Sequence, residues 1–121
     1  MPNSYTFLGV RVDDVTMDDV ITQVTQAIEA KRDFNIVTVN PELVMTATKH
    51  AEFKDIINNA GIVTPDGVGL RIMGMLTGRK LRQRVTGVDL CDRLAKEAAE
   101  HGWSIYLLGA RPDVANQAAT N

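Results

Sequence analysis

The sequence predicts an α/β fold, specifically a Rossmann-like three-layer domain whose mostly parallel sheet is covered by helices on both faces. Short apolar runs rich in β-branched residues alternate with segments of helical periodicity along the 121 residues. Continuous apolar runs are typical of strands buried on both faces, and alternation of strands with helices is typical of parallel sheets. Hydrophobic residues make up 45% and charged residues 23% of the chain, which is ordinary for a folded domain. We therefore expect residues 1–121 to belong to a single domain.

The N-terminal segment is expected to form a strand pair followed by a helix. Residues 5–12 alternate loosely in polarity around Gly9, which predicts a short strand pair or a bulged strand. Thr16 and Asp19 have the spacing of a capping box, so a helix is predicted to begin there. Its apolar residues recur at helical spacing and would form one face: Met17, Val20, Ile21, Val24 and Ile28.

The middle of the chain predicts two buried strands separated by helical segments. Residues 34–39 and 62–64 are short apolar runs with β-branched residues, which favours buried strands. Between them, Asn40 followed by Pro41 is typical of a helix N-cap with proline in the first turn. The helical region that follows is predicted to break near His50 and to end before the second strand.

Beyond the second strand, the pattern predicts two more helices joined by a charged connector. Residues 65–67 turn the chain into an apolar helix over 68–76, and residues 77–84 form a polar, basic connector. Thr86 and Asp89 repeat the capping-box spacing and begin the next helix. The inward stripe of that helix is expected to consist of Leu90, Cys91, Leu94 and Ala98.

The C-terminal segment predicts one more strand and a last helix. Gly102 is expected to end the preceding helix. Residues 104–108 form an apolar run that predicts a third strand, and residues 109–112 lead into the last helix. No further strand precedes Asn121, whereas an open parallel sheet would be expected to continue. We interpret the sequence as the N-terminal portion of a truncated domain.

Composition argues against several classes of function. A net charge of −2 and an aromatic content of 5% disfavour a nucleic-acid partner. Cys91 is the only cysteine, so an intrachain disulfide or a cysteine-rich zinc site cannot form. Residues 1–5 do not have the pattern of a signal peptide, and no run approaches the roughly 20 apolar residues that span a bilayer. We expect a cytoplasmic protein, with a peripheral membrane contact still open.

Three polar segments are each predicted to lie at a strand-to-helix turn. They are residues 38–42, 64–69 and 109–113. Ligands of open parallel sheets bind beyond the carboxyl ends of the strands, so these turns would converge on one crevice. Helix N-termini lining that crevice would favour anions such as phosphate. The glycine-rich fingerprints of dinucleotide-binding and P-loop proteins are both absent from the sequence.

Four short segments share their order and spacing with the signatures of a known family. They are TVNPE at 38–42, TPDGVG at 64–69, RVTGVD at 84–89 and LLGA at 107–110. In these segments the chain resembles the glycosyltransferases of the WecG/TagA/CpsF family. Four motifs in the right order are far more specific than any one alone. The resemblance covers essentially the whole chain, but only the first half or slightly more of the longer family domain.

The resemblance implies an inverting glycosyltransferase. Such an enzyme moves N-acetylmannosamine, or its uronic acid, from a UDP-sugar donor to a polyprenyl-diphosphate-linked N-acetylglucosamine. The product feeds the synthesis of teichoic acid or another cell-surface polysaccharide. The resemblance implies no metal and no other cofactor, and it places the enzyme at the cytoplasmic, inner face of the cell membrane.

The resemblance also assigns roles to individual residues. Asp66 matches the aspartate proposed as the family's catalytic base, and Thr38 and Asn40 match residues that contact the sugar. A single carboxylate suffices as the base of an inverting transfer. Further substrate contacts are implied at Gly67, Arg84, Thr86 and Gly109. Asp113 departs from the family, which usually has glycine there, and a carboxylate at that point would repel a phosphate.

Each of these residues also has a structural interpretation. Asp66 precedes a predicted helix and has the character of an N-cap, as does Asn40. Thr38 could hydrogen-bond within the fold, and Asp89 could serve only as the capping partner of Thr86. The glycines of the signatures fit either close packing or close ligand approach. The basic connector fits a solvated loop, a diphosphate contact or an anionic membrane surface.

Alternative functions remain beside the enzyme. A truncated, non-catalytic module that binds a nucleotide sugar is the main alternative. A nicotinamide-dependent oxidoreductase of similar topology is disfavoured because its glycine fingerprint is absent. An unpaired edge strand would also favour self-association into a homo-oligomer.

Overall fold

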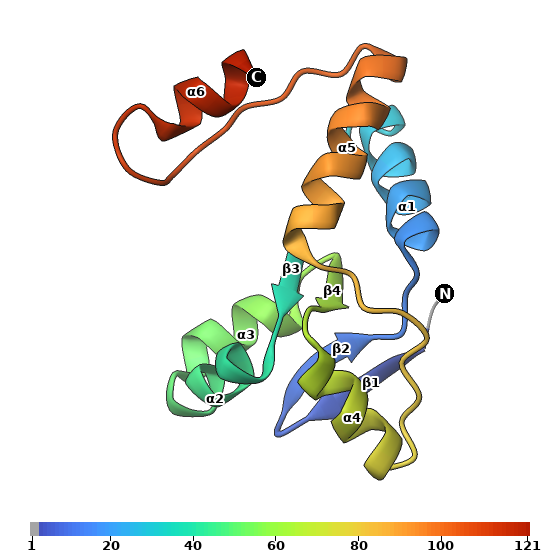
Figure 1. Ribbon diagram of the computed structural model, residues 1–121. Coiled ribbons are helices and arrows are strands. Elements are labelled where there is room, and N and C mark those ends of the chain that lie inside the picture. Colours follow the sequence, from blue (N-terminus) through green and yellow to red (C-terminus); the bar gives the residue numbers. More distant parts are fainter. Residues whose placement is uncertain (1–2) are drawn as a thin grey trace. The chain divides into compact units, whose positions relative to one another are not determined.

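The computed structural model describes residues 3–121 as a mixed α/β chain (Figure 1). Met1 and Pro2, which begin the segment considered above for a signal peptide, lie outside the described residues. Contacts between residues divide the chain into two compact units, one that ends at Leu90 and one that runs from Cys91 to Asn121. All the strands of the described chain belong to the first unit.

The first unit opens with a β-hairpin. Strands β1 (Ser4–Phe7) and β2 (Val10–Asp13) pair antiparallel, with Phe7 opposite Val10. The two residues between them, Leu8 and Gly9, have φ of 50° and 82°. Positive φ at both positions matches the right-handed twist of a two-residue hairpin, and Gly9 adopts it without a steric penalty. The predicted strand pair is therefore confirmed.

Helix α1 (Met17–Glu29) follows the hairpin and begins at the predicted capping box. Thr16 Oγ1 accepts from the Asp19 amide at 3.2 Å, and the Asp19 carboxylate accepts from the Thr16 amide at 2.9 Å. Val20 and Ile21 are buried as expected, but Ile28 is 42% exposed. The buried stripe passes through Ala27 instead, so the predicted face is wrong at its last position.

A parallel strand pair forms the centre of the unit. Strands β3 (Ile36–Val39) and β4 (Ile62–Pro65) pair with Thr38 opposite Thr64. The crossover between them consists of α2 (Pro41–Lys49) and α3 (Ala51–Asn58), which contact each other (Figure 1). His50 between these helices has an extended backbone, with φ −134° and ψ 96°, which confirms the predicted break.

The strands of the described residues form two separate two-stranded sheets. The α/β class and the parallel pairing of two strands are confirmed. The Rossmann-like three-layer arrangement of helices around one mostly parallel sheet stays a prediction. One apolar core joins the hairpin, the parallel pair and the helices that follow the strands. Its fully buried members come from all these elements: Val10, Val12, Val39, Val44, Ile57, Val63 and Leu70.

A buried ion pair fastens the hairpin to β4. Asp13, only 1% exposed, accepts from the amide of Val63 at 2.9 Å and from the guanidinium of Arg11 at 2.7 Å. Burial by itself would raise the pKa of Asp13. Hydrogen bonds from Arg11, Ser4 and Val63 outweigh that effect and lower the pKa below its ordinary value. Arg11 also donates to the carbonyls of Ala60 and Gly61, at the entry of β4.

Two helices complete the elements near the end of β4. Helix α4 (Val68–Leu76) has the predicted bounds, and α5 (Gly87–His101) begins directly after Thr86. Within α5, Leu90 and Ala98 are buried, but Cys91 is exposed. The prediction that Cys91 is buried is therefore wrong, because it lies about 100° around the helix from Leu90.

The second unit contains the end of α5 and helix α6 (Val114–Thr120). The strand predicted over residues 104–108 is absent, and Tyr106 and Leu108 are 86% and 90% exposed. A strand exists only through hydrogen bonds to a neighbouring strand, and the described residues offer this segment none. The segment is apolar, but the prediction that it forms a strand is wrong for the described chain.

Candidate active site

Three chain segments meet at the carboxyl ends of the parallel strands. The amide of Asp66, just after β4, donates to the carbonyl of Val39 at the end of β3, at 2.8 Å. The amide of Val85, just before α5, donates to the carbonyl of Pro65 at 3.0 Å. The turns after β3 and β4 and the start of α5 are thereby held together. The predicted convergence of the first two turns is confirmed.

Asp66 lies at the centre of this arrangement and is half-buried. Its Oδ2 accepts from the amide of Gly87, the first residue of α5, at 3.3 Å. Among residues 3–121, its Oδ1 has no hydrogen-bond partner. The N-cap of α4 is Gly67, and no side chain caps that helix. The interpretation of Asp66 as the cap of α4 is therefore wrong, and one carboxylate oxygen stays free for chemistry.

Thr38 and Gly87 face the same point as Asp66. A methyl group in place of the inward hydrogen of Gly87 would lie 3.7 Å from Thr38 Oγ1 and 4.0 Å from Asp66 Oδ2. The hydroxyl, the carboxylate and the amide of Gly87 thus border one small space. On the neighbouring strand, opposite Thr38, the buried Thr64 Oγ1 has no hydrogen-bond partner in the described chain. The role of Gly87 was open from sequence, although it belongs to the signature at 84–89.

Asn40 performs the capping role that its position predicts. Its Oδ1 accepts from the amide of Leu43 at 2.8 Å, at the start of α2. Its side-chain NH₂ group has no acceptor among the described residues, so this donor is available to a ligand. The structural and functional interpretations of Asn40 are therefore compatible, because each uses a different atom of the amide.

Gly67 and Gly69 place the start of α4 against Pro41. Gly67 has φ of 111°, a conformation that suits glycine. A Cβ at Gly69 would lie 2.8 Å from Pro41 Cγ, so the two turns pack too closely for a larger residue. Of the two interpretations left open for these glycines, close packing is confirmed at Gly69.

The basic connector is a largely exposed loop that is fastened to the rest of the unit at two of its arginines. Arg82 forms an ion pair with Asp14 at 3.1 Å, and Arg79 donates to the carbonyl of Thr6 at 2.6 Å. Leu81 is buried beneath it. Arg84, by contrast, is exposed and has no partner in the described residues. Its guanidinium is available to an anion.

The remaining predicted contacts have different outcomes. Thr86 Oγ1 accepts from the amide of Asp89 at 3.1 Å, which confirms its capping role in α5. Gly109 and Asp113 belong to the second unit, where they have φ of 115° and 71°. Contact of Gly109 with the substrate stays a prediction, and so does the expectation that the Asp113 carboxylate would repel a phosphate.

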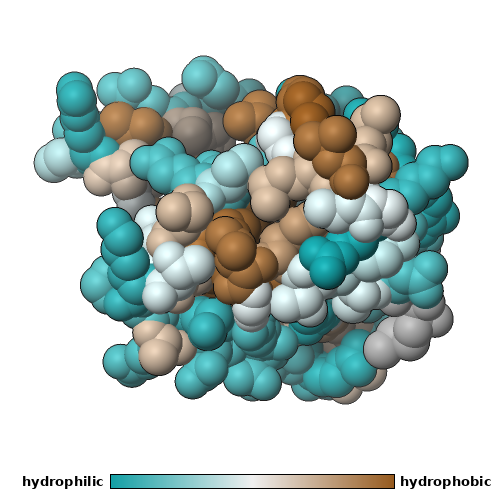
Figure 2. Space-filling model, turned by 90° about the horizontal axis from the view of Figure 1, so that it is seen from below, coloured by the Kyte–Doolittle hydropathy of each residue, from teal (hydrophilic) through white to brown (hydrophobic). Residues whose placement is uncertain are grey.

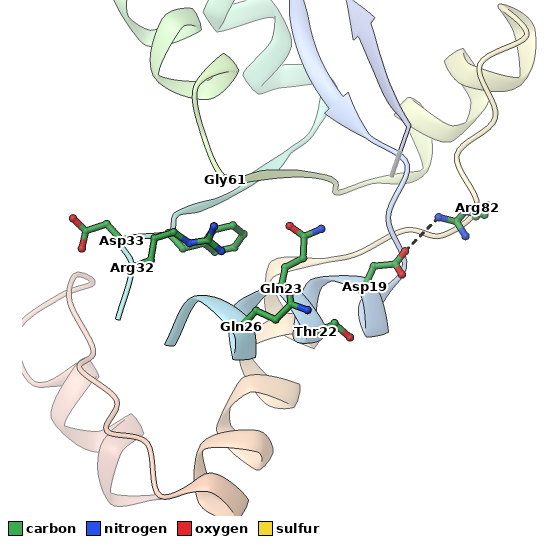
Figure 3. Close-up of a pocket in the computed structure, with 9 residues that line it drawn as sticks. Asp19, Thr22, Gln23, Gln26, Arg32, Asp33, Gly61 and Arg82 are labelled. Atoms are coloured by element: carbon green, nitrogen blue, oxygen red, sulfur yellow. Dashed lines mark hydrogen bonds and ion pairs between the residues drawn. The ribbon is translucent and has the colours of Figure 1, made fainter. Parts of the chain in front are cut away.

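One cavity of the first unit lies away from this site. It has a volume of about 800 Å³ and lies between α1 and the segments that precede β3 and β4 (Figure 3). Its lining includes Gln23 and Gln26 of α1, Arg32 and Asp33, and Gly61. No predicted site residue borders it. Since these are the amino ends of the strands, the cavity lies at the end opposite to the one where ligands of such folds bind.

Within residues 3–121 no three His, Cys, Asp or Glu side chains are grouped as a metal ion would need. No helix in this part of the chain has the length and apolar character required to cross a bilayer. Around Asp66, the site consists of a carboxylate, the Thr38 hydroxyl and the backbone amide of Gly87 at the end of a parallel strand pair. This is the arrangement of an α/β protein with a candidate acid–base centre.

Comparison with known proteins identifies the family. Residues 5–121 match the Glycosyl transferase WecG/TagA/CpsF family, and the chain belongs to it. A relative from Staphylococcus aureus (strain NCTC 8325 / PS 47) is 32% identical over 113 residues, which cover 92% of this chain and 44% of the relative. A relative from Bacillus subtilis (strain 168) is 35% identical over 79 residues, covering 65% of this chain and 31% of the relative. The chain therefore spans less than half the length of these curated relatives.

Both relatives carry the same name, N-acetylglucosaminyldiphosphoundecaprenol N-acetyl-beta-D-mannosaminyltransferase. The name describes transfer of N-acetylmannosamine to a lipid-linked N-acetylglucosamine. The family predicted from the four signatures is confirmed.

Proposed function

We propose that this chain is part of an inverting glycosyltransferase. Its donor is a UDP-linked N-acetylated hexosamine, N-acetylmannosamine or its uronic acid, and its acceptor is polyprenyl-diphosphate-linked N-acetylglucosamine. Family membership and the names of the relatives support this assignment. The observation that carries it is the environment of Asp66, whose Oδ2 is held by the Gly87 amide near the Thr38 hydroxyl while Oδ1 has no partner in the described residues.

Asp66 is proposed to act as the general base. As the acceptor hydroxyl attacks the anomeric carbon, its proton passes to the free oxygen of Asp66. The bond between the anomeric carbon and the diphosphate breaks on the opposite face, and UDP leaves with the electron pair. The hydrogen bond from Gly87 fixes the orientation of the carboxylate while Oδ1 receives the proton.

The neighbouring groups are proposed to position the donor. The Thr38 hydroxyl can donate to and accept from sugar hydroxyls, and the free NH₂ of Asn40 can donate to a sugar or acyl oxygen. The unpaired guanidinium of Arg84 is suited to the negative charge that develops on the departing diphosphate. Gly67, Thr86 and Gly109 complete the proposed set of substrate contacts.

Titration calorimetry of this chain with UDP-N-acetylmannosamine and, separately, with UDP tests the sugar site. Tighter binding of the sugar nucleotide is expected, and Thr38→Val should weaken it about tenfold while leaving UDP binding unchanged. Thr46→Val, at an exposed position on α2, is the matched control. Equal affinities for both ligands would contradict a sugar pocket at Thr38.

A non-catalytic module that binds a nucleotide sugar is the second candidate. A transfer assay with the sugar nucleotide and a lipid-linked acceptor separates the two functions. Binding without turnover by the chain would favour the module, whereas turnover would exclude it.

A further inference from the structure

Thr64 is a polar residue that is buried without a hydrogen-bond partner. Exposed apolar side chains, such as those that Figure 2 shows among polar ones, are ordinary on a protein surface. A buried polar group, by contrast, is expected to have a partner, because its desolvation is otherwise uncompensated. Thr64 is 0% exposed, and its Oγ1 is the one buried side-chain nitrogen or oxygen of the described residues that lacks a hydrogen bond. This unsatisfied group lies in β4, the strand that leads to Asp66.

Other threonines of the chain show how such a hydroxyl is ordinarily satisfied. In the helices it donates to the carbonyl three or four residues earlier, as it does at Thr22, Thr25, Thr46, Thr48, Thr77 and Thr120. A strand offers no carbonyl at that place, because its backbone is extended. The hydroxyl of Thr64 therefore needs a group from a neighbouring element.

Thr64 and Thr38 are neighbours on one face of the parallel pair. They are opposite each other in the register of β3 and β4, and side chains paired in this way point to the same face of a sheet. Val37 and Val63, the residues that precede them, pack in the apolar core on the other face. A methyl group at Gly87 would lie 3.7 Å from Thr38 Oγ1. The face of the two threonines is therefore the face of the candidate site.

The two hydroxyls differ in what they can reach. Thr38 is half-buried, and its Oγ1 has no hydrogen-bond partner among the described residues, so it can contact a ligand. Thr64 is fully buried and cannot contact a ligand itself. Neighbouring strands lie about 4.8 Å apart, a separation at which one threonine hydroxyl can donate to the next. Rotation about χ1 moves a hydroxyl between staggered positions, so the two can meet without a change in strand pairing.

A hydrogen bond from Thr64 fixes the direction in which Thr38 donates. A hydroxyl has one hydrogen and two acceptor sites, so a Thr38 oxygen that accepts from Thr64 keeps its own hydrogen for a ligand. We propose that Thr64 is a positioning residue, whose hydroxyl donates to Thr38 Oγ1 when the sugar donor binds and directs the Thr38 hydrogen to a sugar oxygen. This inference rests on the proposed function, in which Thr38 contacts the donor sugar.

The unsatisfied hydroxyl destabilises the free protein. Thr64→Val keeps the shape of the side chain and removes the hydroxyl, so it should raise the urea midpoint or leave it unchanged. A threonine whose hydroxyl served only the fold would give the opposite result, a lower midpoint. Stability and sugar binding are thus expected to respond differently to the same substitution.

Titration calorimetry of Thr64 variants with UDP-N-acetylmannosamine and with UDP tests the proposal. Thr64→Val should lower the affinity for the sugar nucleotide by about threefold to tenfold and leave the affinity for UDP unchanged. Thr64→Ser, which keeps the hydroxyl, should bind the sugar nucleotide like the unaltered chain. Thr25→Val is the matched control, because it removes a half-buried hydroxyl of α1 that donates to the carbonyl of Ile21. The control should leave both affinities unchanged.

The combined variant Thr38→Val/Thr64→Val shows whether Thr64 acts through Thr38. It should bind the sugar nucleotide no more weakly than Thr38→Val alone, because the hydroxyl that accepts from Thr64 is already absent. Additive losses would overturn the proposal, as would an unchanged sugar affinity in Thr64→Val. Equal losses of sugar-nucleotide and UDP affinity, together with a lower urea midpoint, would show a purely structural role and overturn it as well.

The same titrations separate this proposal from the proposed function. Equal binding of the sugar nucleotide and of UDP by the unaltered chain would refute the sugar site at Thr38, and the role of Thr64 with it. A preference for the sugar nucleotide that Thr38→Val removes and Thr64→Val keeps would refute the role of Thr64 alone.

Discussion

Asp13 and Asp66 are carboxylates of the same unit with opposite environments. Asp13 is 1% exposed, and its two oxygens accept hydrogen bonds from Ser4, Arg11 and the amide of Val63. Asp66 is half-buried and accepts only from the Gly87 amide within residues 3–121. A carboxylate whose acceptor sites are occupied stabilises a fold, whereas one with a free oxygen can take a proton. We therefore expect substitution of Asp66 to lower activity and substitution of Asp13 to lower stability.

The largest expected effect is on turnover. Asp66→Asn should lower the rate of glycosyl transfer by about 10²- to 10⁴-fold, because the amide cannot accept the acceptor's proton. Asn can still accept from the Gly87 amide, so the urea midpoint should change little. Steady-state kinetics and urea denaturation measure the two quantities. Near-normal turnover would remove Asp66 as the base.

The second prediction concerns stability. Asp13→Asn should destabilise the fold by about 3 kcal/mol, since it leaves the Arg11 guanidinium without its counter-charge. Urea denaturation followed by circular dichroism measures the change. Asp55→Asn, at an exposed position on α3, should be nearly neutral and is the control. If both variants were equally stable, the ion pair would not be what fastens the hairpin to β4.

A smaller effect is expected where the two turns of the site pack together. Gly69→Ala should cost about 1–3 kcal/mol, because its Cβ would lie 2.8 Å from Pro41 Cγ and one turn must move. Sugar-nucleotide affinity should fall as well, since Asn40 precedes Pro41. Val68→Ala, at the exposed neighbouring position, is the control. Unchanged stability and affinity in Gly69→Ala would show that the contact can relax freely.

The smallest expected effect is a dependence of stability on pH. The pKa of Asp13 is lowered in the folded state, so its ionisation stabilises the fold fully above the unfolded pKa of about 3.9. That contribution is lost as the pH falls through the lower folded pKa. Urea midpoints measured across this acidic range should therefore fall less steeply in Asp13→Asn than in the unaltered chain. If the urea midpoints of the variant and the unaltered chain fell equally steeply with falling pH, other carboxylates would account for the acid sensitivity.

The local elements of the fold could be predicted well from the sequence. The hairpin at Gly9, the caps at Thr16 and Asn40, and the break at His50 all depend on residues within a few positions of one another. The residues that form each cap or turn are neighbours in sequence, so the sequence pattern is sufficient to predict these features. The family could be predicted for the same reason, because its four signatures are local strings in a fixed order.

The candidate site could be predicted only in part. The sequence indicated Asp66 and Thr38, but the partner of Asp66 depends on a segment 21 residues away, and Asp13 reaches Val63 across 50 residues. The position of Asp66 just before α4 is typical of an N-cap. Its carboxylate instead accepts a hydrogen bond from the amide of Gly87, at the start of α5. No spacing rule predicts such contacts, because they arise from packing and not from periodicity.

The sequence alone determined which segments are helical, where they begin, and that a carboxylate follows the second parallel strand. Tertiary structure decided which atoms of that carboxylate are occupied, and that the buried stripe of α5 excludes Cys91. It also decided that residues 104–108 remain unpaired in the described chain. The physical reason is the range of the interactions. Helix caps and tight turns are satisfied by neighbours in sequence, whereas strands and charged groups are satisfied only by partners that folding brings to them.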